Sequence, residues 1–211
     1  PQAVLQDLAA SSEDVAKFTK AGGENIAEAA IQARKLGLSI ADTAKISEGL
    51  LDFQSSIEKE VEASVLIGKQ LNFQRARELA LNNDIAGATA EVVKQVASQL
   101  HENWRAPRKL EDNTFEPRVK IQALLSDGRT KWFNEGTEPQ DAEVLQSQDI
   151  ANTAFEDLDP QWQAENKAAA EFVVPAVMQA LGENLSLSIS HTTDLADKVH
   201  QAWISRNDWV N

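Results

Sequence analysis

Two pairs of histidine and tryptophan are the residues of this sequence whose types and spacing could form a contact site. His101 and Trp104 recur as His200 and Trp203, each time with an apolar residue directly before the histidine. Residues three apart lie on one face of a helix, so the imidazole can bond a backbone or carboxylate group while the indole packs. A structural pair in each of two related helical units is the favoured interpretation. The alternative is a set of ligand or partner contacts formed by His101, Trp104, Arg105, His200, Trp203 and Arg206.

Metal, cofactor and catalytic chemistry are not indicated by the remaining residues. Three histidines without cysteine or a His-x-x-x-His spacing make a poor metal shell. The carboxylates of residues 135–143 lack the ligand pattern of a calcium loop, so we interpret them as a solvated acidic loop. Nucleophile-elbow, phosphate-binding and dinucleotide-binding glycine motifs are absent. The sequence therefore predicts a protein that is not an enzyme and uses no cofactor and no metal.

The charge balance argues against nucleic acid and membrane partners. The 211 residues carry a net charge of −13, which repels phosphate backbones and anionic lipids, and no basic patch interrupts it. Residues 38–51 faintly resemble a helix-turn-helix, but the helix that would read DNA has no arginine. No apolar run approaches the roughly 20 residues of a membrane span, and no secretion signal is visible.

Composition divides the chain near Ser98. All five tryptophans, all three histidines and five of the six prolines follow this residue. The residues before it are mostly Ala, Leu, Ile, Val, Glu, Gln and Lys, which is typical of helices. We therefore expect two domains, residues 1–98 and residues 99–211.

The first half is predicted to be helical. Gly22, Gly23 and Gly37 follow amphipathic stretches, as glycines that end helices do. Ser39 with Asp42 resembles a capping box and begins the longest periodic segment, residues 39–68. Its apolar stripe consists of Leu50, Phe53 or Gln54, Ile57, Val61 and Val65.

A single helix over residues 39–68 would be about 45 Å long, so we expect it to pack against another helix. Asn72 is predicted to cap a helix that ends at Leu81, and a turn over residues 82–84 precedes a last helix from Ile85.

The second half is predicted to mix helices with a small hairpin. Residues 119–125 and 130–133 have strand patterns around the tight turn Asp127-Gly128, and residues 134–149 resemble a surface loop. Asp159 with Pro160 begins a helix that runs to Gly182. A short strand over 185–189 and a final helix from Thr193 complete a mainly α fold, with one long amphipathic helix in the first half and an α+β second half.

Part of the first half resembles a known family. Within residues 24–97, the stretches 23–26, 30–37, 48–53 and 66–69 look like a segment of the tail tape-measure proteins of tailed bacteriophages. Those proteins are extended and helical, line the tail tube, set its length and help to deliver the genome. The resemblance implies a structural role without catalytic residues.

The second half is similar to a different group, small bacterial and phage proteins distantly like the repeat domain of ryanodine receptors. The similarity lies in residues 101–105, 116–120, 162–166 and 199–203. It implies a module that binds a ligand or a protein, with the histidine and tryptophan pairs as the contact residues.

These resemblances give two functional expectations. The leading one is a phage or prophage structural protein of the virion tail or the bacterial cytoplasm, with protein partners or self-association through amphipathic helices. The alternative is a bacterial binding module of the ryanodine-repeat type. A fusion of two unrelated pieces would also account for the change near Ser98.

Overall fold

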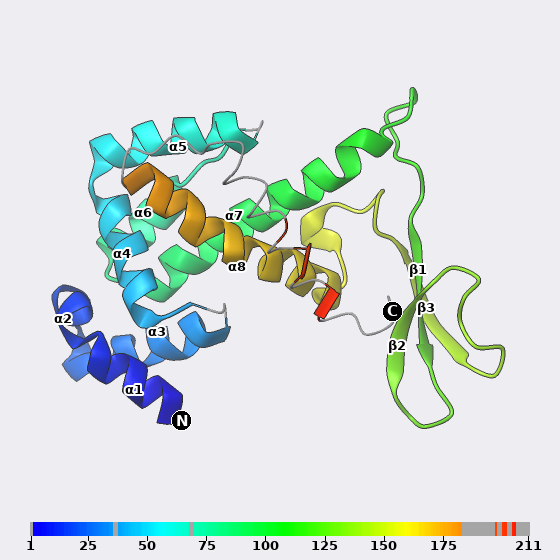
Figure 1. Cartoon of the computed structure of the whole chain (residues 1–211), viewed down its shortest axis with the longest axis horizontal. Helices are drawn as coiled ribbons and strands as arrows, with labels where there is room; N and C mark the ends of the chain where they lie inside the picture. Colours follow the sequence, from blue (N-terminus) through cyan, green and yellow to red (C-terminus); the bar gives the residue numbers. More distant parts are fainter. Residues whose placement is uncertain are drawn as a thin grey trace. The chain divides into compact units, whose positions relative to one another are not determined.

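A computed structural model describes residues 2–35, 38–67, 70–182, 197, 200, 201, 204 and 205 (Figure 1). The described elements are α1 (Gln2–Ala10), α2 (Ser12–Val15), η1 (Ala16–Phe18), η2 (Ala21–Gly23), α3 (Glu24–Lys35), α4 (Ile40–Leu51), α5 (Phe53–Ile67), α6 (Gln74–Leu81), α7 (Ile85–Arg105), η3 (Ala106–Arg108), β1 (Val119–Leu124), β2 (Thr130–Asn134), β3 (Glu143–Asp149), η4 (Phe155–Asp157) and α8 (Pro160–Gly182). The predicted class, mainly α with a small sheet in the second half, is confirmed.

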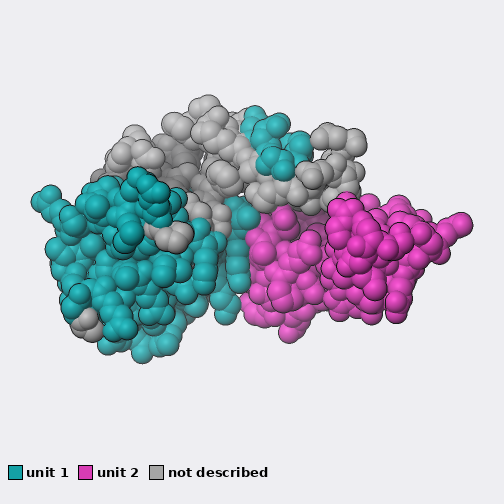
Figure 2. All heavy atoms as spheres, turned by 90° about the horizontal axis from the view of Figure 1, so that it is seen from below, with its two compact units in different colours: residues 1–99, 167–211 teal, residues 100–166 magenta. Residues whose placement is uncertain are grey.

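The chain divides into two compact units, which Figure 2 colours separately. Residues 1–99 and 167–211 form the first unit, and residues 100–166 form the second. The composition boundary near Ser98 falls inside α7, a continuous helix of 21 residues. Helix α8 begins in the second unit, and from Lys167 onward it is grouped with the first. The change of composition therefore marks no loop or linker.

The core of the first unit forms where the apolar faces of its short helices meet. Phe18, Ile26, Ile40 and Ile85 are buried together with alanines of α3 and α4. The small alanine side chains let the helix backbones approach closely, and the larger side chains fill the space between them. This packing fixes α4, from which the chain enters α5.

The predicted helix of residues 39–68 is wrong as a single element. Its capping box is confirmed, because Ser39 Oγ accepts from the Asp42 amide and the Asp42 carboxylate accepts from the Ser39 amide, each at 3.1 Å. The helix then breaks at Asp52, whose ψ is 84°. Asp52 Oδ1 accepts from the Ser55 amide at 3.2 Å, so this side chain caps α5. The long amphipathic helix of the first half is α7 instead.

The glycine break, the end of α6 and the start of α7 are found where they were predicted. Gly22 and Gly23 have φ values of 69° and 98°, in the left-handed region that suits glycine between two helices. Helix α6 ends at Leu81 as predicted, but its N-cap is Phe73 and not Asn72; Asn72 Oδ1 accepts from the Gln74 amide at 2.9 Å in the turn that leads into the helix. A turn then leads to α7 at Ile85.

The second unit contains a three-stranded antiparallel sheet in the order β2-β1-β3. The predicted hairpin is confirmed as β1 and β2, with Leu124 opposite Thr130 and Gly128 at φ 82° in the turn. The loop predicted for residues 134–149 is wrong over residues 143–149, which form β3. This strand pairs with β1, with Asp149 opposite Val119 at one end and Glu143 opposite Leu124 at the other. Five of the seven β3 side chains are exposed, so this edge strand lacks the alternation that identifies half-buried strands.

The start of α8 follows the prediction, since Asp159 Oδ1 accepts from the Gln161 amide at 2.9 Å and Pro160 is the first helical residue. Gly37, Gly68, the strand predicted for 185–189 and the start predicted at Thr193 lie outside the described residues. No helix in the described ranges is both long and apolar enough to cross a membrane.

Candidate functional site

The first histidine and tryptophan pair lies in the last turns of α7, in the second unit. His101 is buried, and its Nε2–H donates to the carbonyl of Thr153 at 3.0 Å. Its ring stacks on Trp104 with centroids 5.7 Å apart and an interplanar angle of 22°. This is the geometry expected of a structural pair, in which the imidazole ties α7 to the loop after β3.

The indole of Trp104 is engaged by residues of its own helix and of η3. The guanidinium of Arg108 lies over the indole, with Cζ 4.5 Å from the ring centroid, and it also donates to the Trp104 carbonyl. His101 in the preceding turn and Arg108 in the following one thus both contact this ring. Trp104 remains partly exposed, so a partner would meet the uncovered part of the indole.

Arg105 is held in place by charge and by an aromatic ring. Its Nη2 forms an ion pair with Glu102 at 2.6 Å, and its Cζ lies 4.5 Å from the centroid of Phe115. Its Nη1 lies 3.4 Å from the carbonyls of Ala151 and of Thr153, the residue that His101 also bonds. Arg105 therefore joins α7 to two separate loops of the second unit.

The structure brings together three of the six predicted contact residues. His101, Trp104 and Arg105 form one cluster in the second unit. His200 is helical and exposed, whereas Trp203 and Arg206 lie outside the described residues.

Acid is expected to destabilise the second unit through His101. Burial lowers the pKa of His101 below its ordinary 6.5, and the Arg105 charge acts in the same direction, while the Thr153 carbonyl opposes it. The unfolded chain then binds the proton more tightly, so the stabilisation from neutral His101 is complete above about pH 6.5 and is lost as the pH falls below it.

The variant His101→Gln keeps a side-chain amide that can reach the same carbonyl but cannot titrate. We expect the free energy of unfolding to fall less for this variant than for the wild type between about pH 7.5 and about pH 5.5. Urea titrations followed by tryptophan fluorescence measure this difference. Equal pH dependence in the two proteins would contradict the assignment.

A second aromatic cluster lies where α8 meets the sheet, and the sequence patterns did not single it out. Trp132 of β2 and Trp162 of α8 make an edge-to-face contact with centroids 5.6 Å apart. Lys120 Nζ lies 5.4 Å from the Trp162 ring centroid, and burial lowers the pKa of this lysine, with the Arg118 charge contributing. Both indole N–H groups are buried without a hydrogen-bond acceptor in the part of the chain that the structure describes.

The first unit exposes an apolar patch on α5 and α6. We define this α5–α6 patch as four side chains with exposed fractions of 45, 59, 52 and 57%, namely Phe53, Val61, Ile57 and Leu81. Three of them, Phe53, Ile57 and Leu81, line a groove of about 610 Å³ between the two helices. The sequence predicted that the helix carrying this stripe packs against another helix; the structure buries Leu50 and leaves Phe53, Ile57 and Val61 exposed, and the side chain of Val65 is not described.

The inner face of α5 is polar, which explains this exposure. Arg77 of α6 is buried and donates from Nε to Ser56 Oγ at 2.6 Å and from Nη2 to the Ser56 carbonyl at 3.0 Å. Its Nη2 also forms an ion pair with Glu60 at 2.7 Å, and Glu60 accepts from the Phe73 amide at 2.8 Å. No sequence motif predicted this network, because its partners lie 17 and 21 residues apart.

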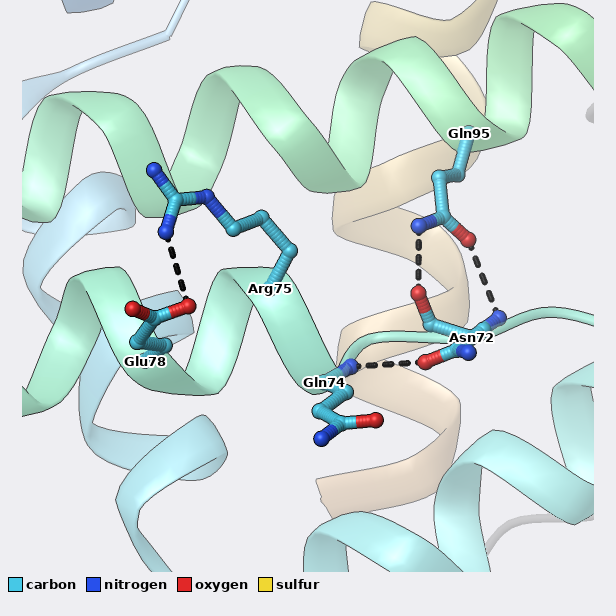
Figure 3. Close-up of a pocket in the computed structure, with 5 residues that line it drawn as sticks. All are labelled: Asn72, Gln74, Arg75, Glu78 and Gln95. Atoms are coloured by element: carbon cyan, nitrogen blue, oxygen red, sulfur yellow. Dashed lines mark hydrogen bonds and ion pairs between the residues drawn. The ribbon is translucent and has the colours of Figure 1, made fainter.

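A smaller pocket of about 300 Å³ lies beside the start of α6 (Figure 3). The Gln95 side chain reaches from α7 to the Asn72 backbone, accepting from its amide at 3.0 Å and donating to its carbonyl. Arg75 and Glu78 pair with each other at 2.7 Å. Because these polar groups bond one another, we interpret them as structural contacts that hold α6 against α7, and not as a binding site.

No family model, curated protein or solved structure matches this chain. Within the described ranges, no group of three or more His, Cys, Asp or Glu residues could hold a metal ion. The geometry above and the two sequence resemblances are therefore the basis of the functional proposal.

Proposed function

We propose that this chain is a non-enzymatic structural protein of a phage or prophage, of the tail or tape-measure type, which acts through helix packing and protein–protein contact. The observation that carries the contact role is the α5–α6 patch, an apolar helix face exposed beside a groove. Exposed patches of this kind commonly mark protein interaction sites. The phage assignment is supported by the resemblance of residues 24–97 to tape-measure proteins.

Fractionation of phage particles tests this proposal. We expect peptides of the chain to co-purify with intact virions or isolated tails from cells in which the phage or prophage is induced. A host cytoplasmic protein of similar size serves as the control for carry-over. Recovery only in the fraction that lacks particles would contradict the proposal.

The second candidate is the binding module of the ryanodine-repeat type. It is favoured by the Trp132 and Trp162 cluster, because a buried indole N–H without an acceptor is costly and a bound acceptor group would satisfy it. Lys120 lies beside the Trp162 indole and also donates to Asn134 Oδ1 at 2.6 Å, and its positive charge would favour an anionic acceptor such as a carboxylate.

A fluorescence titration tests this second candidate. We expect one or more small carboxylates in a panel to change the tryptophan emission of the full chain in a saturable manner. Trp132→Phe keeps the aromatic ring but removes the N–H, so it should weaken that response about tenfold. Trp104→Phe distinguishes the two aromatic clusters, because a loss of the response in this variant would place the contact at the His101–Trp104 pair and not at Trp132. Absence of any saturable response, or an unchanged response in Trp132→Phe, argues against this module.

A further inference from the structure

We propose that the sheet face against which α8 begins binds a short dicarboxylate, through the indole N–H groups of Trp132 and Trp162 and the side-chain amides of Gln122 and Asn134. This inference rests on the second candidate function, the binding module, and deepens it by naming the ligand class and two further contact residues.

This face of the sheet presents two adjacent rows of polar and aromatic side chains. Lys120 and Gln122 of β1 are two residues apart, so their side chains lie on the same face, in rows about 7 Å apart. In β2, Asn134 lies opposite Lys120 and Trp132 lies opposite Gln122. The first turn of α8 lies against the same face, because Trp162 contacts both Trp132 and Lys120.

Two charged groups fix the direction in which the amides of these rows point. The Asp159 carboxylate accepts from Gln146 Nε2 at 3.2 Å, and the same Nε2 donates to Gln122 Oε1 at 3.0 Å. The NH₂ group of Gln122 therefore points away from Gln146. In the other row, Lys120 Nζ donates to Asn134 Oδ1 at 2.6 Å, so the NH₂ group of Asn134 points away from the ammonium. No residue that the structure describes accepts from either NH₂ group.

The two indoles add further donors. Trp132 is 8% exposed, and its Nε1–H and that of Trp162 are buried without an acceptor among the described residues. A buried donor without an acceptor costs free energy that a bound acceptor group recovers. A ligand reaches these N–H groups by displacing the side chains that cover them, whereas Asn134 is exposed and Gln122 is half-buried.

The uncommitted polar groups select the ligand class. They are the donors of Gln122, Asn134 and the two indoles, while Gln146 Oε1 is an acceptor for which the described residues provide no donor. Donors therefore outnumber acceptors, which favours carboxylates, since an ionised carboxylate accepts and does not donate. One carboxylate is too small to reach both rows, which are about 7 Å apart. Two carboxylates joined by a short methylene chain can engage both.

The local charges are compatible with a dianion. Lys120 and Arg118 are both cationic, and burial together with the Arg118 charge lowers the pKa of Lys120. The carboxylates of Asp159 and Glu165, at the start of α8, are engaged in interactions within the chain. The net charge of −13 repels anions at long range, but 0.1 M salt limits this repulsion to about 10 Å.

Isothermal titration calorimetry of the full chain with succinate, glutarate and adipate tests the ligand class. We expect at least one of these dicarboxylates to bind at least about tenfold more tightly than acetate, because it engages both rows. If none of the three binds more tightly than acetate, the proposal is overturned.

Two isosteric variants test the contacts. Gln122→Glu keeps an oxygen facing Gln146 but replaces the outward NH₂ with a carboxylate oxygen, so it should weaken dicarboxylate binding about tenfold. Asn134→Asp does the same in the row of Lys120 and should also weaken it. Gln140→Glu adds the same charge in the exposed loop before β3 and should leave the affinity unchanged.

Melting temperatures establish that each variant is folded. If either carboxylate variant is unfolded, Trp162→Phe replaces it, because phenylalanine keeps an aromatic ring and removes the N–H. Wild-type affinity for the dicarboxylate in the folded variants would overturn the proposed contacts.

The outcomes separate this inference from the binding module itself. Acetate that binds as tightly as the dicarboxylates, with a loss in Trp132→Phe, would overturn the dicarboxylate class and leave the module standing. Absence of a saturable response to every carboxylate would contradict the module and this inference together. Neither result bears on the phage assignment, which the fractionation of virions tests.

Discussion

Replacing Arg77 with methionine is expected to lower the free energy of unfolding of the first unit by about 3 kcal/mol. Arg77 is buried between α5 and α6, where it bonds Ser56 and forms an ion pair with Glu60. Methionine fills a similar volume, but it leaves the Glu60 carboxylate largely buried with the Phe73 amide as its remaining described donor. Most of the loss therefore comes from a charge without its counterion.

Urea unfolding followed by far-ultraviolet circular dichroism measures this loss. The control is Arg75→Met, because the Arg75–Glu78 pair is exposed and such pairs contribute about 0–1 kcal/mol. The double variant Arg77→Met with Glu60→Met should recover part of the stability, since it removes the carboxylate that the single variant leaves unpaired. Equal losses for Arg77→Met and Arg75→Met would show that the network does not hold α5 to α6.

Replacing Phe18 with alanine is expected to cost about 3–5 kcal/mol. Phe18 is 1% exposed and packs in the cluster that contains Ile26, Ile40 and Ile85. Truncation of a buried aromatic ring removes its transfer free energy and leaves a cavity, which the surrounding alanines are too small to fill. The helices on both sides of η1 should lose stability together.

Phe53→Ala is the matched control, because it deletes the same atoms from an exposed position. At low protein concentration we expect a change of at most about 0.5 kcal/mol. Thermal and urea unfolding of both variants at low protein concentration give the comparison. A large loss for Phe53→Ala under these conditions would mean that the α5 stripe is buried within the chain.

Local signals made much of the secondary structure predictable. The capping box at Ser39, the Asp127-Gly128 turn and the Asp159-Pro160 helix start each depend on groups within a few residues of one another. Asp52 shows the limit of this reasoning. The periodic stripe continues through it, but its carboxylate accepts from the Ser55 backbone amide and caps α5, and an aspartate within an apolar period does not by itself mark such a break.

The candidate sites depended more on tertiary contacts. The spacing of His101 and Trp104 predicted a shared helix face, but not the Thr153 carbonyl 52 residues away that fixes the imidazole. Trp132 and Trp162 come from a strand and a helix, so no sequence spacing brings them together. Strand β3 has mostly exposed side chains and is specified by its backbone pairing with β1.

The sequence by itself therefore determined the helical character, the caps at Ser39 and Asp159, the tight turns and the apolar stripe of α5, because each follows from backbone preferences or periodicity within a short stretch. Only the tertiary structure decided which face of α5 is exposed. The buried guanidinium of Arg77 requires Ser56 and Glu60 on the inner face, and satisfying that charge leaves Phe53, Ile57 and Val61 outside. Periodicity detects a stripe, but long-range pairing of polar groups sets the direction in which it points.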